Sequence, residues 1–132
     1  MKVAIIGSRG ITVDNINEYL PKCSEIISGG AKGVDACAEI FAQRNKIKLT
    51  LFKPEYNLFG RAAPIVRNKK IVEYSDYIIA FWDGESRGTR SVIEYAKKCN
   101  KPCKVIIIKS TARSKKQSLS ATVHNPNFSK NK

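Results

Sequence analysis

Residues 26–43 read IISGGAKGVDACAEIFAQ, and this stretch joins a short apolar run to a segment of helical periodicity through a glycine-rich loop. Apolar residues recur at i, i+3, i+4, i+7 and i+8, at Val34, Cys37, Ala38, Phe41 and Ala42. This spacing predicts a helix with one buried face. The residues expected in water are Asp35, Glu39, Gln43 and Lys46. The stretch therefore predicts a strand, a glycine-rich turn and a helix in direct succession.

Similar short runs of apolar, β-branched or aromatic residues occur at 3–6, 47–52, 77–82 and 105–108. Most lack an apolar/polar alternation, which is typical of strands buried on both faces of a parallel sheet. Further helices are expected at about 14–21, 62–74 and 87–99. Strands alternating with helices predict a Rossmann-like α/β fold, a three-layer sandwich around a five-stranded parallel sheet of order 3-2-1-4-5.

The charge of the chain is unevenly distributed. The 132 residues carry a formal net charge of +13, and the stretch 110–132 holds five basic and no acidic side chains. That stretch has too few large apolar residues to offset its ordering entropy. We expect one domain over residues 1–109 and a flexible basic tail over 110–132. The positive charge favours a polyanionic partner, although solubility alone could also explain it.

No apolar run is long enough for a signal peptide or a membrane span, so we expect a cytoplasmic protein without a membrane partner. The four cysteines match neither a zinc nor a redox spacing, so neither a metal nor a cofactor is predicted. Whether the chain forms a homo-oligomer is left open.

The loops after the first, second and fourth strands are the candidates for ligand binding, because ligands of such sheets bind at the carboxyl ends of strands. The first loop, Gly7-Ser8-Arg9-Gly10, is too short for the G-x-G-x-x-G fingerprint, which argues against NAD. In the second, GGAKG at 29–33, glycines allow close approach, and the following helix start favours an anion. We interpret this loop as the chief phosphate contact, although it could be a simple turn.

The loop at 83–89 leads into a second helix start, where Ser86 or Thr89 can cap and Gly88 permits close approach. On the preceding helix, Arg67 can reach an anion, and Asn68 is either a structural hydrogen-bond partner or a ligand contact. The candidate ligand-binding residues are Gly7, Ser8, Arg9, Gly29, Gly30, Lys32, Gly33, Asp35, Arg67, Asn68, Asp83, Ser86, Gly88 and Thr89.

These motifs together resemble the SLOG superfamily of Rossmann-like domains, and most closely its small stand-alone bacterial and phage members. The resemblance rests on Gly7-Ser8-Arg9, GGAKGVD at 29–35, Arg67-Asn68, SRGT at 86–89 and Ala96, and it covers residues 1 to about 108. It implies a pocket for nucleotides or nucleotide-derived molecules, made by the GGAKG and SRGT loops.

Two branches of that superfamily imply different functions. The Lonely Guy phosphoribohydrolases carry PGG-x-GT-x-x-E with a catalytic final acid, and here Val92 stands at the position of that acid. The DNA-processing protein A branch binds single-stranded DNA, and GGAKGVD with Arg67-Asn68 is more similar to its motifs.

The first hypothesis is binding or sensing of a nucleotide-derived, phosphate-bearing ligand, and the second is a single-stranded nucleic-acid module. The third is a nucleoside-monophosphate glycosidase using Glu94, Asp35 or Asp83. We assign no catalytic residue, because the single histidine, His124, lies in the predicted tail.

Overall fold

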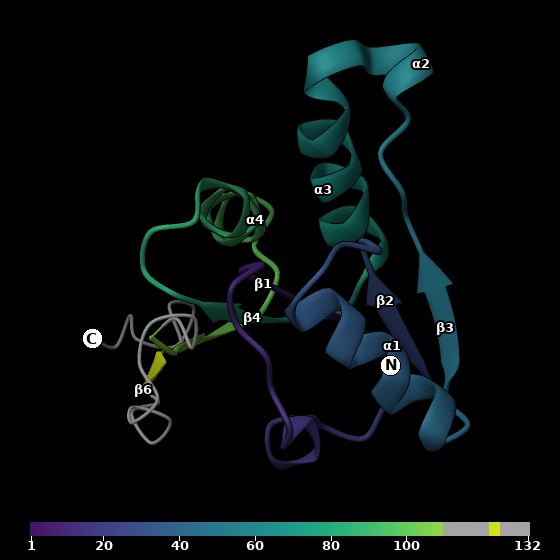
Figure 1. Cartoon of the computed structure of the whole chain (residues 1–132), viewed down its shortest axis with the longest axis vertical. Coiled ribbons are helices and arrows are strands. Elements are labelled where there is room, and N and C mark those ends of the chain that lie inside the picture. Colours follow the sequence, from purple (N-terminus) through teal and green to yellow (C-terminus); the bar gives the residue numbers. More distant parts are fainter. Residues whose placement is uncertain (110–121, 125–132) are drawn as a thin grey trace.

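A computed structural model describes residues 1–109 and 122–124 of the chain. Its sheet has the order β3-β2-β1-β4-β5-β6 (Figure 1). The strands are β1 (Lys2–Gly7), β2 (Glu25–Ser28), β3 (Lys48–Leu51), β4 (Tyr77–Trp82), β5 (Cys103–Ile107) and β6 (Thr122–His124). The first five are all parallel, which confirms the predicted order 3-2-1-4-5.

The edge strand β6 was not predicted, and it pairs antiparallel with β5. It lies within the segment that the sequence assigned to a flexible tail. The rest of that tail, residues 110–121 and 125–132, lies outside the described residues.

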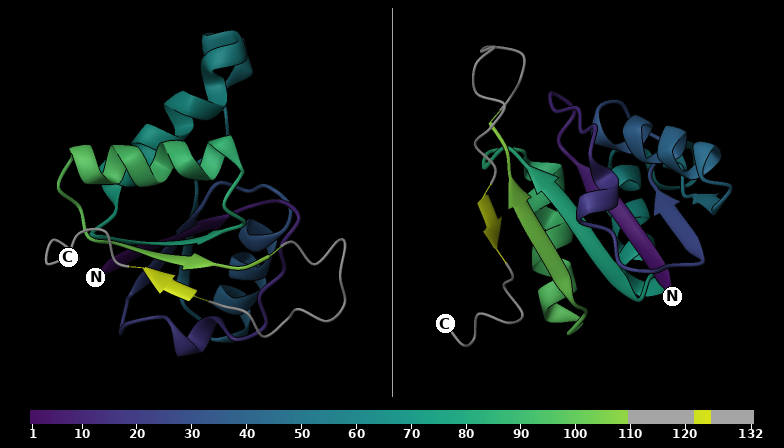
Figure 2. Two further views of the ribbon diagram at one scale, coloured as in Figure 1. Left: turned by 90° about the vertical axis from the view of Figure 1, so that its left-hand side faces the viewer. Right: turned by 90° about the horizontal axis from the view of Figure 1, so that it is seen from below.

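Helices cover both faces of the sheet, as a three-layer sandwich requires (Figure 2). The helices are α1 (Val34–Arg44), α2 (Tyr56–Phe59), α3 (Ala63–Tyr74) and α4 (Arg87–Lys98). Successive β1 side chains alternate between faces: Val3 packs in the cluster with α1, and Ala4 packs in the one with α3 and α4. Within the described part, no helix is long and apolar enough to cross a membrane.

The helix expected at about 14–21 is wrong. The segment holds only a 3-10 turn, η1 (Ile16–Glu18), in an otherwise irregular connection from β1 to β2. Its apolar residues are nevertheless buried, because Ile11, Val13 and Ile16 pack into the cluster on the α1 face. These side chains are buried although the segment is a loop, because the loop runs along the surface of the core. The spacing of its apolar residues resembles that of a short helix, which explains the wrong prediction.

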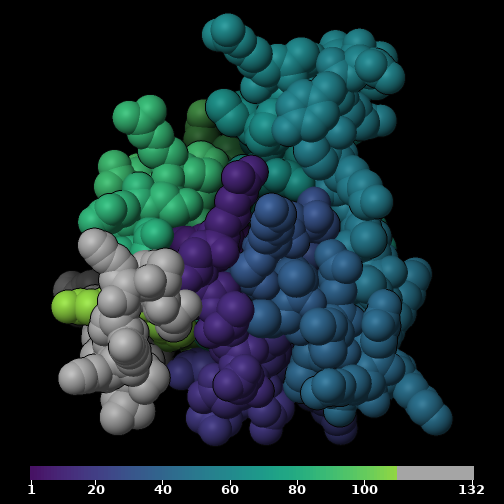
Figure 3. All heavy atoms as spheres, viewed as in Figure 1, coloured from purple at the N-terminus to yellow at the C-terminus, as the bar shows by residue number. Residues whose placement is uncertain are grey.

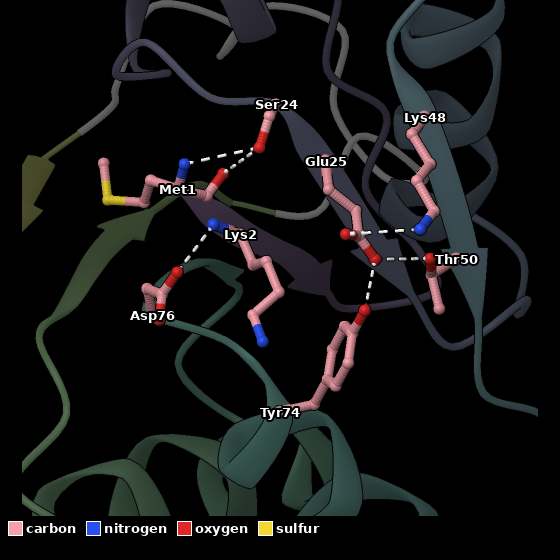
Figure 4. A network of polar contacts seen from close by, with 8 residues as sticks. All are labelled: Met1, Lys2, Ser24, Glu25, Lys48, Thr50, Tyr74 and Asp76. Atoms are coloured by element: carbon pink, nitrogen blue, oxygen red, sulfur yellow. Dashed lines mark hydrogen bonds and ion pairs between the residues drawn. The ribbon is translucent and has the colours of Figure 1, made fainter.

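A polar network closes the sheet at the amino ends of the strands (Figure 4). The Glu25 carboxylate accepts hydrogen bonds from Thr50 Oγ1 at 2.6 Å and from the Tyr74 hydroxyl at 2.7 Å, and Lys48 Nζ lies 3.8 Å away. The bond from Thr50 and then that from Tyr74 lower the pKa of Glu25. Each of these polar groups is bonded to another protein group, so the network links the strands to α3. Polar groups that could bind a ligand are therefore sought at the carboxyl ends of the strands.

Candidate functional site

A pocket of about 440 Å³ lies at the carboxyl ends of β1, β2 and β4. β1 and β4 are neighbours in the sheet, and the winding direction reverses between them. All of the predicted ligand-binding residues line the pocket except Gly30, Lys32 and Gly33. Six further lining residues are not among the predicted ligand contacts: Ile6, Gly10, Ala31, Pro64, Ile71 and Val92. The pocket is therefore the site at which the sequence-based candidates meet.

Ser8 joins the β1 loop to the β4 loop. Its backbone N–H donates to the Phe81 carbonyl at 3.1 Å, and its hydroxyl oxygen accepts from the Asp83 N–H at 3.2 Å. Ser8 is only 1% exposed, so these bonds are shielded from water. This seryl side chain fixes the spacing of two of the three loops that form the pocket.

The start of α4 is held in place by Asp83 and Ser86. Asp83 Oδ1 accepts the backbone N–H groups of Glu85 and Ser86, each at 2.8 Å. Ser86, one of the two caps that the sequence allowed, is the N-cap, and its hydroxyl oxygen accepts from the Thr89 N–H at 3.5 Å. Partial burial raises the pKa of Asp83, but the bonds from Glu85, Ser86 and Ser8 outweigh it, so the net pKa is lowered.

Asp35 occupies a different environment from the one the sequence predicted. We expected it in water, and that expectation is wrong, because Asp35 is 6% exposed. Its side chain turns back onto the GGAKG loop, where Oδ2 accepts from the Ala31 N–H at 3.2 Å. Burial raises the pKa of Asp35, and the hydrogen bond from Ala31 and the charge of Arg67 offset only part of this rise.

Arg67 reaches from α3 to the same loop. Its Nη1 donates to the Gly29 carbonyl at 2.7 Å, and its Nε donates to Asn68 Oδ1 at 2.8 Å. A Cβ atom added at Gly29 would lie 2.7 Å from Arg67 Nη1 and 3.0 Å from Asp35 Oδ2. A side chain at position 29 would therefore displace the Arg67 guanidinium, because that group and the Asp35 carboxylate approach the backbone there.

The GGAKG loop contributes less to the pocket than the sequence predicted, since only Gly29 and Ala31 of this segment line it. Gly33 has φ +72°, and an added Cβ would lie 2.5 Å from the Arg9 carbonyl oxygen, so Gly33 seats the loop on the β1 turn. Gly30 and Lys32 are exposed and lie outside the pocket lining. Their contact with a ligand stays a prediction.

Asn68 lines the pocket and is also hydrogen-bonded within the protein. Besides accepting from Arg67, its Nδ2 donates to Ser91 Oγ at 3.5 Å. The structural alternative offered by the sequence is thus present, and a ligand contact remains open because the residue faces the cavity. In residues 1–109 and 122–124, no three His, Cys, Asp or Glu side chains group as metal ligands would.

Fold and pocket together define an α/β chain of the Rossmann-like class with a cavity where the sheet order reverses. No protein-family model matches the sequence, and no curated protein matches it.

Proposed function

We propose that the pocket binds the phosphate of a nucleotide-derived ligand, and that the protein acts as a binding or sensing domain. The observation that carries this proposal is the convergence of two helix starts and two guanidinium groups, those of Arg9 and Arg67, on one cavity. Gly88 and Thr89 in the first turn of α4 and Arg67 line the pocket. Asp35 in the first turn of α1 lines it too, and its carboxylate suits a ribose hydroxyl rather than the phosphate. The first N–H groups of a helix lack intrahelical partners and carry partial positive charge, which favours an anion.

The remaining walls suit the uncharged part of such a ligand. Ile6, Pro64, Ile71 and Val92 present apolar surface, and Asn68 adds an amide to the lining. A cavity of about 440 Å³ falls in the range of small-molecule sites. Apolar walls with a few polar groups suit a base and ribose whose phosphate is held at one end.

The resemblance to the SLOG superfamily supports the same ligand class. Val92, which replaces the catalytic acid of the Lonely Guy motif, is 2% exposed and lines the cavity. An apolar group there can pack against a ligand but cannot transfer a proton. This favours binding over glycosidic cleavage, which was the third hypothesis.

Isothermal titration with AMP, ADP, ADP-ribose and adenosine tests the proposal. We expect the phosphorylated compounds to bind and adenosine to bind far more weakly. Arg67→Ala should weaken nucleotide binding roughly tenfold or more, because hydrogen bonds to charged groups are among the strongest. Arg44→Ala is the matched control, since it removes the same charge from the last turn of α1. Absence of binding by every phosphorylated compound would refute the proposal.

A further inference from the structure

A second cavity, of about 410 Å³, lies beside the first between the connection from β3 to α2 and helix α3. The segment that bounds it, α2 with η2 (Gly60–Ala62), projects beyond the body of the domain (Figures 1 and 3). The sequence did not predict this projection. Three basic side chains line the cavity, Lys53, Arg67 and Lys70. The lone carboxylate of its lining is Glu55, which pairs with Lys70 at 3.2 Å.

Arg67 is shared by the two cavities. Its Nη1 donates to the Gly29 carbonyl, on the wall of the first cavity, and to the Phe52 carbonyl at 3.4 Å, on the wall of the second. Lys53 lines the second cavity and lies close to the GGAKG loop, because a Cβ added at Gly30 would lie 3.7 Å from Lys53 Cγ and Cε. Arg67 therefore lies on the boundary between the cavities, and Lys53 adds a second cation on the side of the second cavity.

The second cavity also offers an aromatic surface. Phe59 lines it, is 38% exposed and lies with its ring centroid 5.6 Å from Lys70 Nζ. Tyr56 on the same short helix is 59% exposed. An exposed aromatic ring among basic side chains is the arrangement that stacks on nucleobases while cations hold the adjoining phosphates.

We propose that the second cavity is a subsite for a second nucleotide unit, so that the ligand is two nucleotides joined by a phosphate that lies at Arg67 and Lys53. This inference rests on the proposed function, because the first unit occupies the pocket described above. The second base stacks on Phe59. The same chemistry is present in a free dinucleotide and in a single strand of nucleic acid, and chain length distinguishes these two sources.

The test compares AMP, the 5′-phosphorylated dinucleotide pApA and the octamer pA8 by isothermal titration. We expect pApA to bind roughly tenfold or more tightly than AMP, since stacking of one base on an aromatic ring has about that effect. Phe59→Ala and Lys53→Ala should each remove most of this gain and leave AMP affinity unchanged. Arg61→Ala, a basic residue of the projection that lines neither cavity, should change nothing.

Equal affinity for AMP and pApA would overturn the subsite while leaving the proposed function standing, whereas failure of all three to bind would overturn both. The subsite would also be refuted if Phe59→Ala bound pApA with the affinity of wild type. If pA8 binds more tightly than pApA, the ligand comes from a single strand, and if they bind equally, it is a free dinucleotide. If wild type is a dimer, and Phe59→Ala dissociates it without changing the affinity for pApA, the projection is a dimer interface and the subsite is refuted.

Discussion

Gly88→Ala should make the protein more stable and at the same time weaken ligand binding. Gly88 is the second residue of α4, and a Cβ added there meets nothing within 4 Å. Alanine in place of helical glycine stabilises a folded protein by about 0.5–1 kcal/mol. For a chain of this size that corresponds to a rise of roughly 2–4 °C in the midpoint of thermal unfolding.

The open space around Gly88 is part of the pocket, so the new methyl group stands where a ligand phosphate approaches the start of α4. Crowding of this kind costs about 1–3 kcal/mol, which is fivefold or more in affinity. Thermal unfolding followed by circular dichroism and titration with a bound nucleotide measure the two effects.

Gly84→Ala is the contrasting variant. Its Cβ also meets no neighbour, but Gly84 has φ +85° and does not line the pocket. The Gly84→Ala variant should have a free energy of unfolding lower by about 1 kcal/mol, because alanine is strained at a positive φ. A lower unfolding midpoint for Gly88→Ala would refute the structure at this helix start. A higher midpoint with unchanged affinity would refute the placement of the phosphate.

Three further predictions concern single residues. Burial raises the pKa of Asp35, so the stability that the protonated side chain contributes is fully present below its ordinary pKa of 3.8 and is lost as the pH rises through the raised pKa. In urea unfolding from pH 3 to 7, the free energy of unfolding of Asp35→Asn should therefore rise relative to that of wild type as the pH rises. Gly33→Ala should lower the free energy of unfolding by about 3 kcal/mol or more, because Gly33 has a positive φ and lies against the Arg9 carbonyl. A decrease below about 1 kcal/mol in denaturant unfolding would contradict this. Thr50→Val removes a hydrogen bond to Glu25, so calorimetry should show a loss of about 1 kcal/mol with nucleotide affinity unchanged.

The sheet could be predicted from the sequence because its signal is local and strong. Strands buried on both faces appear as continuous apolar runs, and the predicted range 77–82 coincides with β4. The carboxyl-end rule then placed most of the candidate residues around one cavity. Neither step needed knowledge of side-chain conformation.

The rest depended on backbone conformation that no periodicity reveals. Asp35 lies on the polar side of its helix by spacing, yet its carboxylate turns back to the Ala31 N–H and becomes buried. Helix α2 has only four residues, too few to show a period, so the projection and the exposure of Tyr56 and Phe59 went unpredicted. The sharing of Arg67 between two cavities depends on a contact over 38 positions, to Gly29, that only the folded chain shows.

The proposed site places the ligand phosphate between the starts of α1 and α4. The most direct measurement is an amide chemical-shift titration of the ¹⁵N-labelled chain with AMP, with adenosine as the reference. The largest shifts that are specific to AMP should fall on residues 7–10, 29–35 and 86–89, together with the Arg67 side chain. AMP-specific shifts confined to other surfaces, or none at saturating AMP, would contradict this placement of the phosphate.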